Sequence, residues 1–222
     1  MGKRFMTVKG VGKASLAPDT IQIDFTLEAR AESYDQTINY ATQQLEELRN
    51  CLSQLGFMKS DLVTTQFLVD TDYESVKNEE GEYIRVFKGY IVRNNLKLSF
   101  PLDNKRLGCL LEQLSQCEAH PEFTIRYLLK NDQELKALII QNAVQHAIKN
   151  AQILAASSEV LLGEIISIEY DWSTIAYQTR EFNLTEASSY SVAQIDLQPD
   201  LITASDSVTI TWKLKKKEQD DD

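Results

Sequence analysis

The stretch VKGVGKASLAPDTIQIDFTLEAR, residues 8–30, decides the fold. In its second half, five apolar side chains alternate with polar ones: Ile21, Ile23, Phe25, Leu27 and Ala29. Because successive side chains of a strand point to opposite faces, this pattern predicts a half-buried strand. Gly10 and Gly12 come before it, and Pro18 and Asp19 stand at its start. We therefore expect an earlier strand, a turn over residues 10–19, and a return strand.

Composition limits the classes of protein that this chain can represent. Its 222 residues are 43% hydrophobic and 25% charged, which is enough for a globular core. The formal net charge is -10, whereas a nucleic-acid partner requires clustered Lys and Arg. No apolar run approaches the roughly 20 residues that a membrane-spanning helix needs. The sequence predicts no nucleic-acid partner and no membrane span.

The N-terminus and the cysteines bear on the cellular location. The opening MGKRFMTV has basic residues but no apolar segment behind them, so it does not resemble a signal peptide. Cys51, Cys109 and Cys117 are odd in number and show no C-x-x-C spacing, which predicts reduced thiols without a disulfide framework or zinc site. We expect a cytoplasmic protein from the chain as given. The alternative is a periplasmic or cell-surface location, if a signal peptide was removed.

The periodicity changes several times along the chain. After Ser33, apolar residues recur every three or four positions up to Gly56, which predicts a helix. Residues 61–73 and 83–100 are rich in β-branched and aromatic residues and flank an acidic loop over 74–82, which predicts a long hairpin. Asp103 is a predicted cap of a second helix, and residues 123–129 alternate again as a strand.

The longest predicted helix covers residues 133–157. Its small side chains, Ala143, Ala147, Ala151 and Ala155, recur every four residues, which allows close approach to a neighbouring element. That element is either the chain's own sheet or a helix of another subunit. A strand from Gly163 follows, then a loop without clear period over 173–204, and a final strand over 208–214.

Together these elements predict the fold class. Strand, helix, strand, strand, helix, strand over residues 20–129 is the split βαβ order of ferredoxin-like folds. We expect an α+β fold with an antiparallel or mixed sheet and helices mainly on one face. A long helix and two further strands extend this core. One domain should cover residues 1–215, with a hairpin arm over about 64–99, the 173–204 loop, and a disordered acidic tail over 216–222.

Five short motifs occur in a fixed order along nearly the whole chain. They are Gly10-x-Gly12 with Pro18-Asp19; Leu55-Gly56-Phe57 before a strand; Gly89-Tyr90 with Asn94, Asn95 and Leu96; the alanine-spaced helix followed by Leu162-Gly163; and Pro199 before the alternating last strand. In this the chain resembles the SIMPL-domain family, a domain of unknown function that includes bacterial periplasmic and outer-membrane immunogenic proteins.

The resemblance has departures and implications. Ser158 and Glu159 stand where the family tends to place a helix-ending glycine, which argues against a left-handed cap there. Asp200 replaces a glycine often found after the late proline, so that turn should differ. The family is associated with stress tolerance, surface antigens and a signalling adaptor in animals. The resemblance therefore implies a binding or assembly role without defining a chemistry.

The sequence contains no catalytic, cofactor or metal signature. Ser15 stands where a dinucleotide-binding G-x-G-x-x-G needs its third glycine, and a strand follows instead of a helix. Asp70, Asp72 and Glu74 suggest calcium, but the rest of an EF-hand loop is missing, so a solvated hairpin edge is the expected alternative. His120 and His146 have no ligand partner at helical spacing, and we interpret them as structural or surface residues. The sequence therefore predicts no enzyme and no cofactor.

Aromatic residues remain as candidates for an interface. They lie on the predicted hairpin and in the 173–204 loop, outside the core stripes: Tyr73, Tyr83, Phe87, Tyr90, Tyr177, Phe182 and Tyr190. Exposed aromatics are enriched in interfaces, although isolated ones are also normal on a surface.

Two functions are consistent with the sequence. The first is a non-enzymatic, self-assembling or binding domain with a stress-related or scaffolding role, whose partners are a homo-oligomer or another protein. The second is a small-ligand-binding protein or hydrolase with a pocket under the 173–204 loop, formed by carboxylates distant in sequence.

Overall fold

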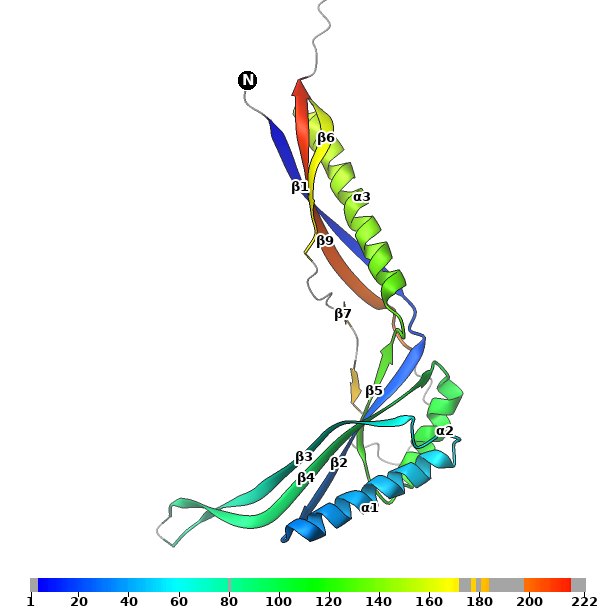
Figure 1. The fold of residues 1–222 in the computed structure, drawn as a ribbon, viewed down its shortest axis with the longest axis vertical. Coiled ribbons are helices and arrows are strands. Elements are labelled where there is room, and N and C mark those ends of the chain that lie inside the picture. Colours follow the sequence, from blue (N-terminus) through cyan, green and yellow to red (C-terminus); the bar gives the residue numbers. More distant parts are fainter. Residues whose placement is uncertain (1–3, 80, 172–176, 179–180, 184–197, 217–222) are drawn as a thin grey trace, which may run out of the picture. The chain divides into compact units, whose positions relative to one another are not determined.

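The computed structural model describes residues 4–79, 81–171, 177–178, 181–183 and 198–216 (Figure 1). The chain divides into two compact units. The first unit takes residues 1–18, 129–179 and 200–222, and the second takes residues 19–128 and 180–199. Each has its own antiparallel sheet. The prediction of a single domain over residues 1–215 is not tested by this division.

The second unit contains the split βαβ core. Its elements are β2 (Thr20–Ala31), α1 (Tyr34–Ser53), β3 (Leu62–Lys77), β4 (Tyr83–Pro101), α2 (Asn104–Ser115), β5 (Glu122–Leu128) and β8 (Glu181–Asn183). The strands follow the order β3-β4-β2-β5-β8, and each neighbouring pair is antiparallel. The first four of these strands have the ferredoxin-like order. The predicted α+β class and its antiparallel sheet are confirmed.

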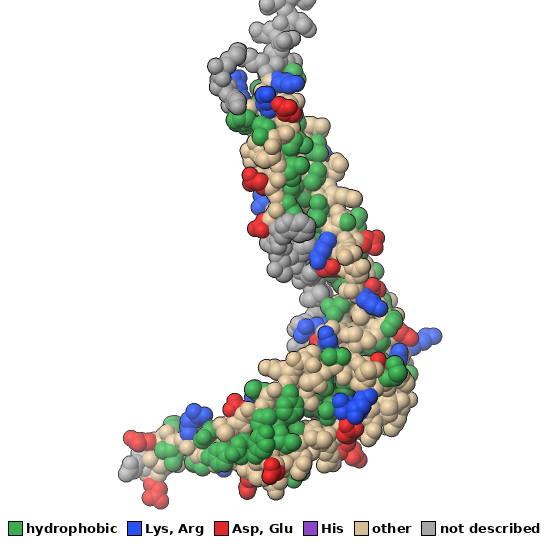
Figure 2. Space-filling view, in the orientation of Figure 1, with side chains coloured by type: hydrophobic (Ala, Val, Ile, Leu, Met, Phe, Trp, Pro, Cys, Tyr) green, Lys and Arg blue, Asp and Glu red, His purple; other side chains and the backbone are tan. Residues whose placement is uncertain are grey.

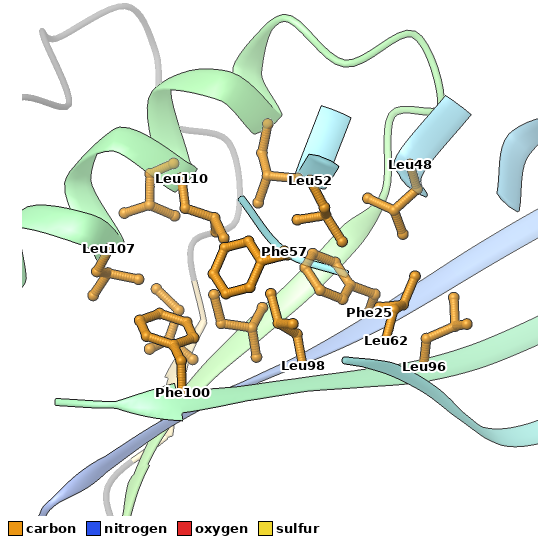
Figure 3. Packing of buried hydrophobic residues seen from close by; sticks show 14 of the residues in the cluster. Phe25, Leu48, Leu52, Phe57, Leu62, Leu96, Leu98, Phe100, Leu107 and Leu110 are labelled. Carbon is orange, nitrogen blue, oxygen red and sulfur yellow. The ribbon is translucent and has the colours of Figure 1, made fainter. Parts of the chain in front are cut away.

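The core of this unit lies between the sheet and its two helices. The five alternating residues of β2 are all buried, as their pattern predicts. Leu48 and Leu52 of α1 and Leu107 and Leu110 of α2 form one cluster with the first four of them. In Figure 3 these leucines lie opposite the side chains of the strands. The core thus forms on one face of the sheet, which is why β2 needs apolar residues only at alternate positions.

The predicted helix ends of the second unit are confirmed by their hydrogen bonds. Ser33 Oγ accepts from the backbone N–H of Gln36 at the start of α1. Asp103 accepts from the N–H groups of the first turn of α2, at 3.0 Å each. Gly56 lies two residues beyond Gln54, the C-cap residue of α1, and has a φ of +78°, a left-handed conformation common where a helix ends.

The first unit packs one long helix on a second sheet. It contains β1 (Phe5–Leu16), α3 (Gln133–Ser157), β6 (Val160–Glu169), β7 (Tyr177–Gln178) and β9 (Ile202–Lys216). β9 pairs with β1 on one side and with β6 and β7 on the other. Three buried alanines of α3, Ala143, Ala147 and Ala151, pack against Val8, Val208, Ile210 and Trp212. The alanine ridge therefore lies on the chain's own sheet.

The expected turn over residues 10–19 is wrong. β1 runs straight through both glycines, pairing Gly10 with Val208 and Gly12 with Asp206. β1 and β2 also belong to different sheets, so they do not form a hairpin. The glycines are needed for space instead: a Cβ on Gly10 would overlap the carbonyl oxygen of Ala143 and lie 2.6 Å from the Ala147 nitrogen.

Other predicted boundaries also shift. β9 begins at Ile202, within the expected 173–204 loop, and β3 continues to Lys77, within the expected 74–82 loop. β6 begins at Val160 instead of Gly163. A left-handed residue does follow α3, because Glu159 has a φ of +54°. The predicted disordered tail lies outside the described residues, except for Lys216 at the end of β9.

Candidate functional site

The paired ends of β3 and β4, residues 70–77 and 83–88, form a two-stranded ribbon that we call the arm. Where the arm leaves the sheet, a bulge puts Asp72 opposite Gly89 but Tyr73 opposite Phe87. The pairing of β2 with β4 ends at the same place, at Ala31 and Tyr90. Gly89 has a φ of +138°, and a Cβ there would overlap the Ala31 carbonyl oxygen. A glycine is thus required for β4 to pass the end of β2.

One face of the arm carries a chain of aromatic rings. Tyr73 and Phe87 are direct cross-strand partners with ring centroids 5.6 Å apart. Phe87 contacts Tyr90 at 5.6 Å, and Tyr90 contacts Tyr34 of α1 at 5.7 Å, all edge to face. The Arg85 guanidinium lies 4.7 Å from the Tyr73 ring centroid. Edge-to-face contacts of this kind hold the rings in a defined arrangement.

The opposite face of the arm is aliphatic. Val76 pairs with Ile84, and two residues further along each strand Glu74 pairs with Val86, so both pairs lie on the same face. Because directly paired residues share a face and the faces alternate, Val76, Ile84 and Val86 lie on the side away from the rings. These side chains are 37–46% exposed, and Tyr83, Phe87 and Tyr73 are 76%, 47% and 43% exposed. Figure 2 shows hydrophobic side chains gathered along this part of the second unit.

The edge strands of the two sheets differ in how their backbones are protected. Side chains of α3 bond backbone groups at the free edge of β1: Asn142 Nδ2 donates to the Lys13 carbonyl at 2.9 Å, and His146 Nδ1 accepts from the Val11 N–H at 3.0 Å. β3 is the outer strand of its sheet, and among the described residues it pairs only with β4. Unpaired strand edges are sites where another chain can add.

Ion pairs surround the base of the arm. Glu28 accepts hydrogen bonds from Arg30 and Arg93, and Arg30 also contacts Asp72 at 3.0 Å. Partial burial raises the pKa of Glu28, but the hydrogen bonds and charges of the two arginines outweigh it and lower the pKa overall. Glu74 pairs with Lys88 at 2.8 Å, which raises the pKa of that lysine. The base of the arm is therefore charged but locally neutralised.

The structure separates the seven predicted interface residues. It brings Tyr73, Phe87 and Tyr90 into one cluster and places Tyr83 further out on the same face of the arm. Tyr177 lies on β7 in the first unit, and Phe182 lies on β8 in the second. Tyr190 lies outside the described residues.

Other exposed residues of this surface were not predicted from the sequence. Tyr34 and Arg85 join the ring cluster, and Val76, Ile84 and Val86 form the aliphatic face of the arm. The sequence does contain a pattern that indicates these two faces: Tyr83, Arg85 and Phe87 alternate with Ile84 and Val86. On β6, which was predicted only as a strand from Gly163, Ile165, Ile166 and Ile168 are also 47–57% exposed.

Two acidic groups of the arm have cationic side chains as partners. Asp72 is paired with Arg30 and Glu74 with Lys88, so their charges are already balanced. Within the described ranges, no three His, Cys, Asp or Glu side chains gather as a metal ion would require. The helices of the described part of the chain are also too short or too polar to cross a membrane.

A polar hollow of about 280 Å³ lies between β2 and α1. Its lining includes Glu28, Arg30, Tyr40, Gln43 and Glu47. Glu28 is bound by two arginines, and Glu47 accepts from Gln43 at 2.8 Å. The volume is at the lower limit for a small-molecule site. The alternative pocket predicted under the 173–204 loop lies largely outside the described residues.

Comparison with known families gives one match. The family model described as SIMPL, "Protein of unknown function (DUF541)", matches residues 6–212. The match therefore begins within β1, ends within β9 and includes the core of both units. No curated protein matches the chain.

Proposed function

We propose that this chain, which belongs to the SIMPL family, is a non-enzymatic assembly domain. Its arm binds a second copy of the same chain. The observation that supports this most is the exposed arm with its ring cluster on one face and aliphatic side chains on the other. A scaffolding or stress-related role is the wider function that we expect such an assembly to serve.

The arm has little to stabilise it without a partner. None of residues 70–77 or 83–88 is buried. An isolated two-stranded ribbon is marginally stable in water and needs a further strand or a packed face. A partner that covers the arm would provide both, because the arm offers two apolar faces and the free edge of β3.

A second copy fits this surface better than an unrelated partner of strong charge. The arm carries charges of both signs: Glu74 pairs with Lys88, Asp72 pairs with Arg30, and Arg85 lies over the Tyr73 ring. Two copies related by a two-fold axis present the same patch to each other, so the surface must complement itself. A ribbon with mixed charges, apolar faces and an open edge can do so through antiparallel strand addition.

Native mass in solution tests the proposal. The full chain is examined by sedimentation velocity across protein concentrations up to about 100 μM, which would detect dissociation constants in the micromolar range. The variant Tyr83→Ser removes the most exposed aromatic of the arm, and Phe87→Ser removes the centre of the ring cluster. We expect each to weaken self-association by roughly tenfold or more, as exposed aromatic anchors do.

Tyr40→Ser is the matched control, since Tyr40 is 52% exposed but lies on α1. It should leave the association constant unchanged. A wild-type chain that stays monomeric at every concentration would refute self-assembly, and equal weakening by Tyr40→Ser would place the interface elsewhere. The absence of enzymatic activity and the cytoplasmic location stay predictions.

A further inference from the structure

Two cysteines that are far apart in the sequence meet in the core of the second unit. Cys51 lies in the last turn of α1, and Cys117 follows the end of α2. The Cys51 thiol donates a hydrogen bond to the Cys117 sulfur at 2.7 Å. Cys117 is 1% exposed, Cys51 is half-buried, and both border the main apolar cluster. The third cysteine, Cys109, is exposed and takes no part.

We propose that Cys51 and Cys117 are a redox modification site, which a low-molecular-weight disulfide such as oxidised glutathione converts into an intramolecular disulfide. The two sulfurs are already in contact, and a disulfide bond is about 2.05 Å long, so small side-chain rotations suffice. The sequence predicted reduced thiols and no disulfide framework, and the thiols are free here. Their adjacency, however, could not be read from the spacing.

The reaction balances as two thiol–disulfide exchanges. The less buried Cys51, after losing its proton, attacks one sulfur of oxidised glutathione and releases one glutathione thiolate. The thiolate of Cys117 then attacks the Cys51 sulfur of the mixed disulfide and releases the second glutathione. The protein loses two protons and two electrons, and glutathione disulfide is reduced to two thiols.

The surroundings make this exchange slow at neutral pH. Burial and the hydrogen bond with Cys117 raise the pKa of Cys51 to about 12, and the Glu47 carboxylate acts in the same direction. Because the thiolate is the attacking species, the oxidation is carried out at about pH 9. The adjacency of the second thiol then favours ring closure over a persistent mixed disulfide.

The disulfide would link the two ends of the segment that contains the arm. The segment between the two cysteines, residues 52–116, contains β3, β4 and α2. Linking its ends restricts the unfolded chain and so stabilises the folded state. The inference depends on the geometry of the two thiols and does not require the assembly proposed above.

The test uses the full-length Cys109→Ser variant, which removes the exposed thiol. It is incubated folded with oxidised glutathione, quenched by acid, and analysed by intact mass and by non-reducing peptide mapping. We expect a loss of two hydrogens, a peptide linking Cys51 to Cys117, and a rise in Tm of roughly 5–15 °C that dithiothreitol reverses. The double variant Cys109→Ser/Cys51→Ser should show no such rise.

Two results would overturn the inference. One is recovery of both thiols unchanged from the folded chain, and the other is accumulation of a stable glutathione adduct on Cys51 without ring closure. If the double variant does not fold, the oxidised and reduced forms of Cys109→Ser still decide the question by mass and by Tm. The mass readout does not depend on the oligomeric state, and the Tm values of the oxidised and reduced forms are compared at one protein concentration, because self-association would shift both.

Discussion

At the scale of single residues, Gly89 controls how the arm leaves the sheet. Its positive φ is strained for other residues, and a Cβ would also lie 2.7 Å from the Glu32 Cα. We expect Gly89→Ala to lower the free energy of unfolding by roughly 2–4 kcal/mol, since strain and overlap add. Urea denaturation followed by circular dichroism measures this loss.

Gly81→Ala separates the two causes. Gly81 also has a positive φ, of +85°, but a Cβ there would meet only the end of the Lys77 side chain at 3.7 Å. Its substitution should cost about 1 kcal/mol, from backbone strain alone. Equal losses for the two variants would mean that the approach of Ala31 to Gly89 is unimportant.

Glu159 has a left-handed backbone conformation that is unfavourable for a residue with a side chain. It follows the C-cap residue of α3 with a φ of +54°, where glycine is favoured. Glu159→Gly should therefore raise the free energy of unfolding by roughly 0.5–1 kcal/mol. The neighbouring Ser158 has an ordinary φ of -101°, so Ser158→Gly should lower it. Thermal denaturation of both variants checks the opposite signs.

At the scale of elements, the contact of β1 with α3 depends on glycine for space. A Cβ on Gly10 would overlap the helix backbone at Ala143, so the strand and helix would have to separate. We expect Gly10→Ala to destabilise the protein by roughly 2–4 kcal/mol, measured by chemical denaturation. Gly108→Ala in α2 is the control, because its Cβ would meet nothing within 4 Å.

The control should have the opposite effect. Alanine is favoured over glycine in a helix interior by about 0.5–1 kcal/mol, so Gly108→Ala should stabilise the protein. A Gly10→Ala variant as stable as the wild type would show that β1 does not approach α3 so closely.

Elements that carry their own periodic pattern could be predicted from the sequence. β2, α1 and α2 each show a complete apolar face, and Ser33 and Asp103 provide local caps. The course of β1 could not be predicted, because its glycines make room for the backbone of α3, a helix that begins more than 100 residues later in the sequence. The early start of β9 was hidden by Asp206, which interrupts the apolar alternation and accepts from the Tyr170 hydroxyl at 2.7 Å.

The candidate site could be predicted only in part, because it too depends on contacts between residues that are distant in the sequence. Aromatic content identified Tyr73, Phe87 and Tyr90, but their contact depends on a bulge that sets the register of β3 and β4. Tyr34 joins them through the start of α1, which no local pattern indicates. The pairing of Cys51 with Cys117 likewise depends on the packing of α1 and α2 over one sheet.

At the scale of the whole molecule, net charge bears on the proposed assembly. Each chain carries a formal net charge of -10 at pH 7, so two copies repel one another at low ionic strength. The arm exposes apolar side chains on both faces, and two of its acidic groups, Glu74 and Asp72, are paired with Lys88 and Arg30. Screening should therefore weaken the repulsion between copies more than it weakens the contacts that hold them.

We expect self-association to tighten as salt is added. The dissociation constant should fall severalfold between about 20 mM and about 200 mM sodium chloride, because the Debye length drops below about 10 Å over this range. Sedimentation equilibrium at several salt concentrations measures it. Tyr83→Ser provides the control, since a chain without its aromatic anchor should remain weakly associated at every salt concentration. If added salt instead dissociates the wild-type assembly, ion pairs between copies hold it together, and the apolar faces of the arm are not its main contact.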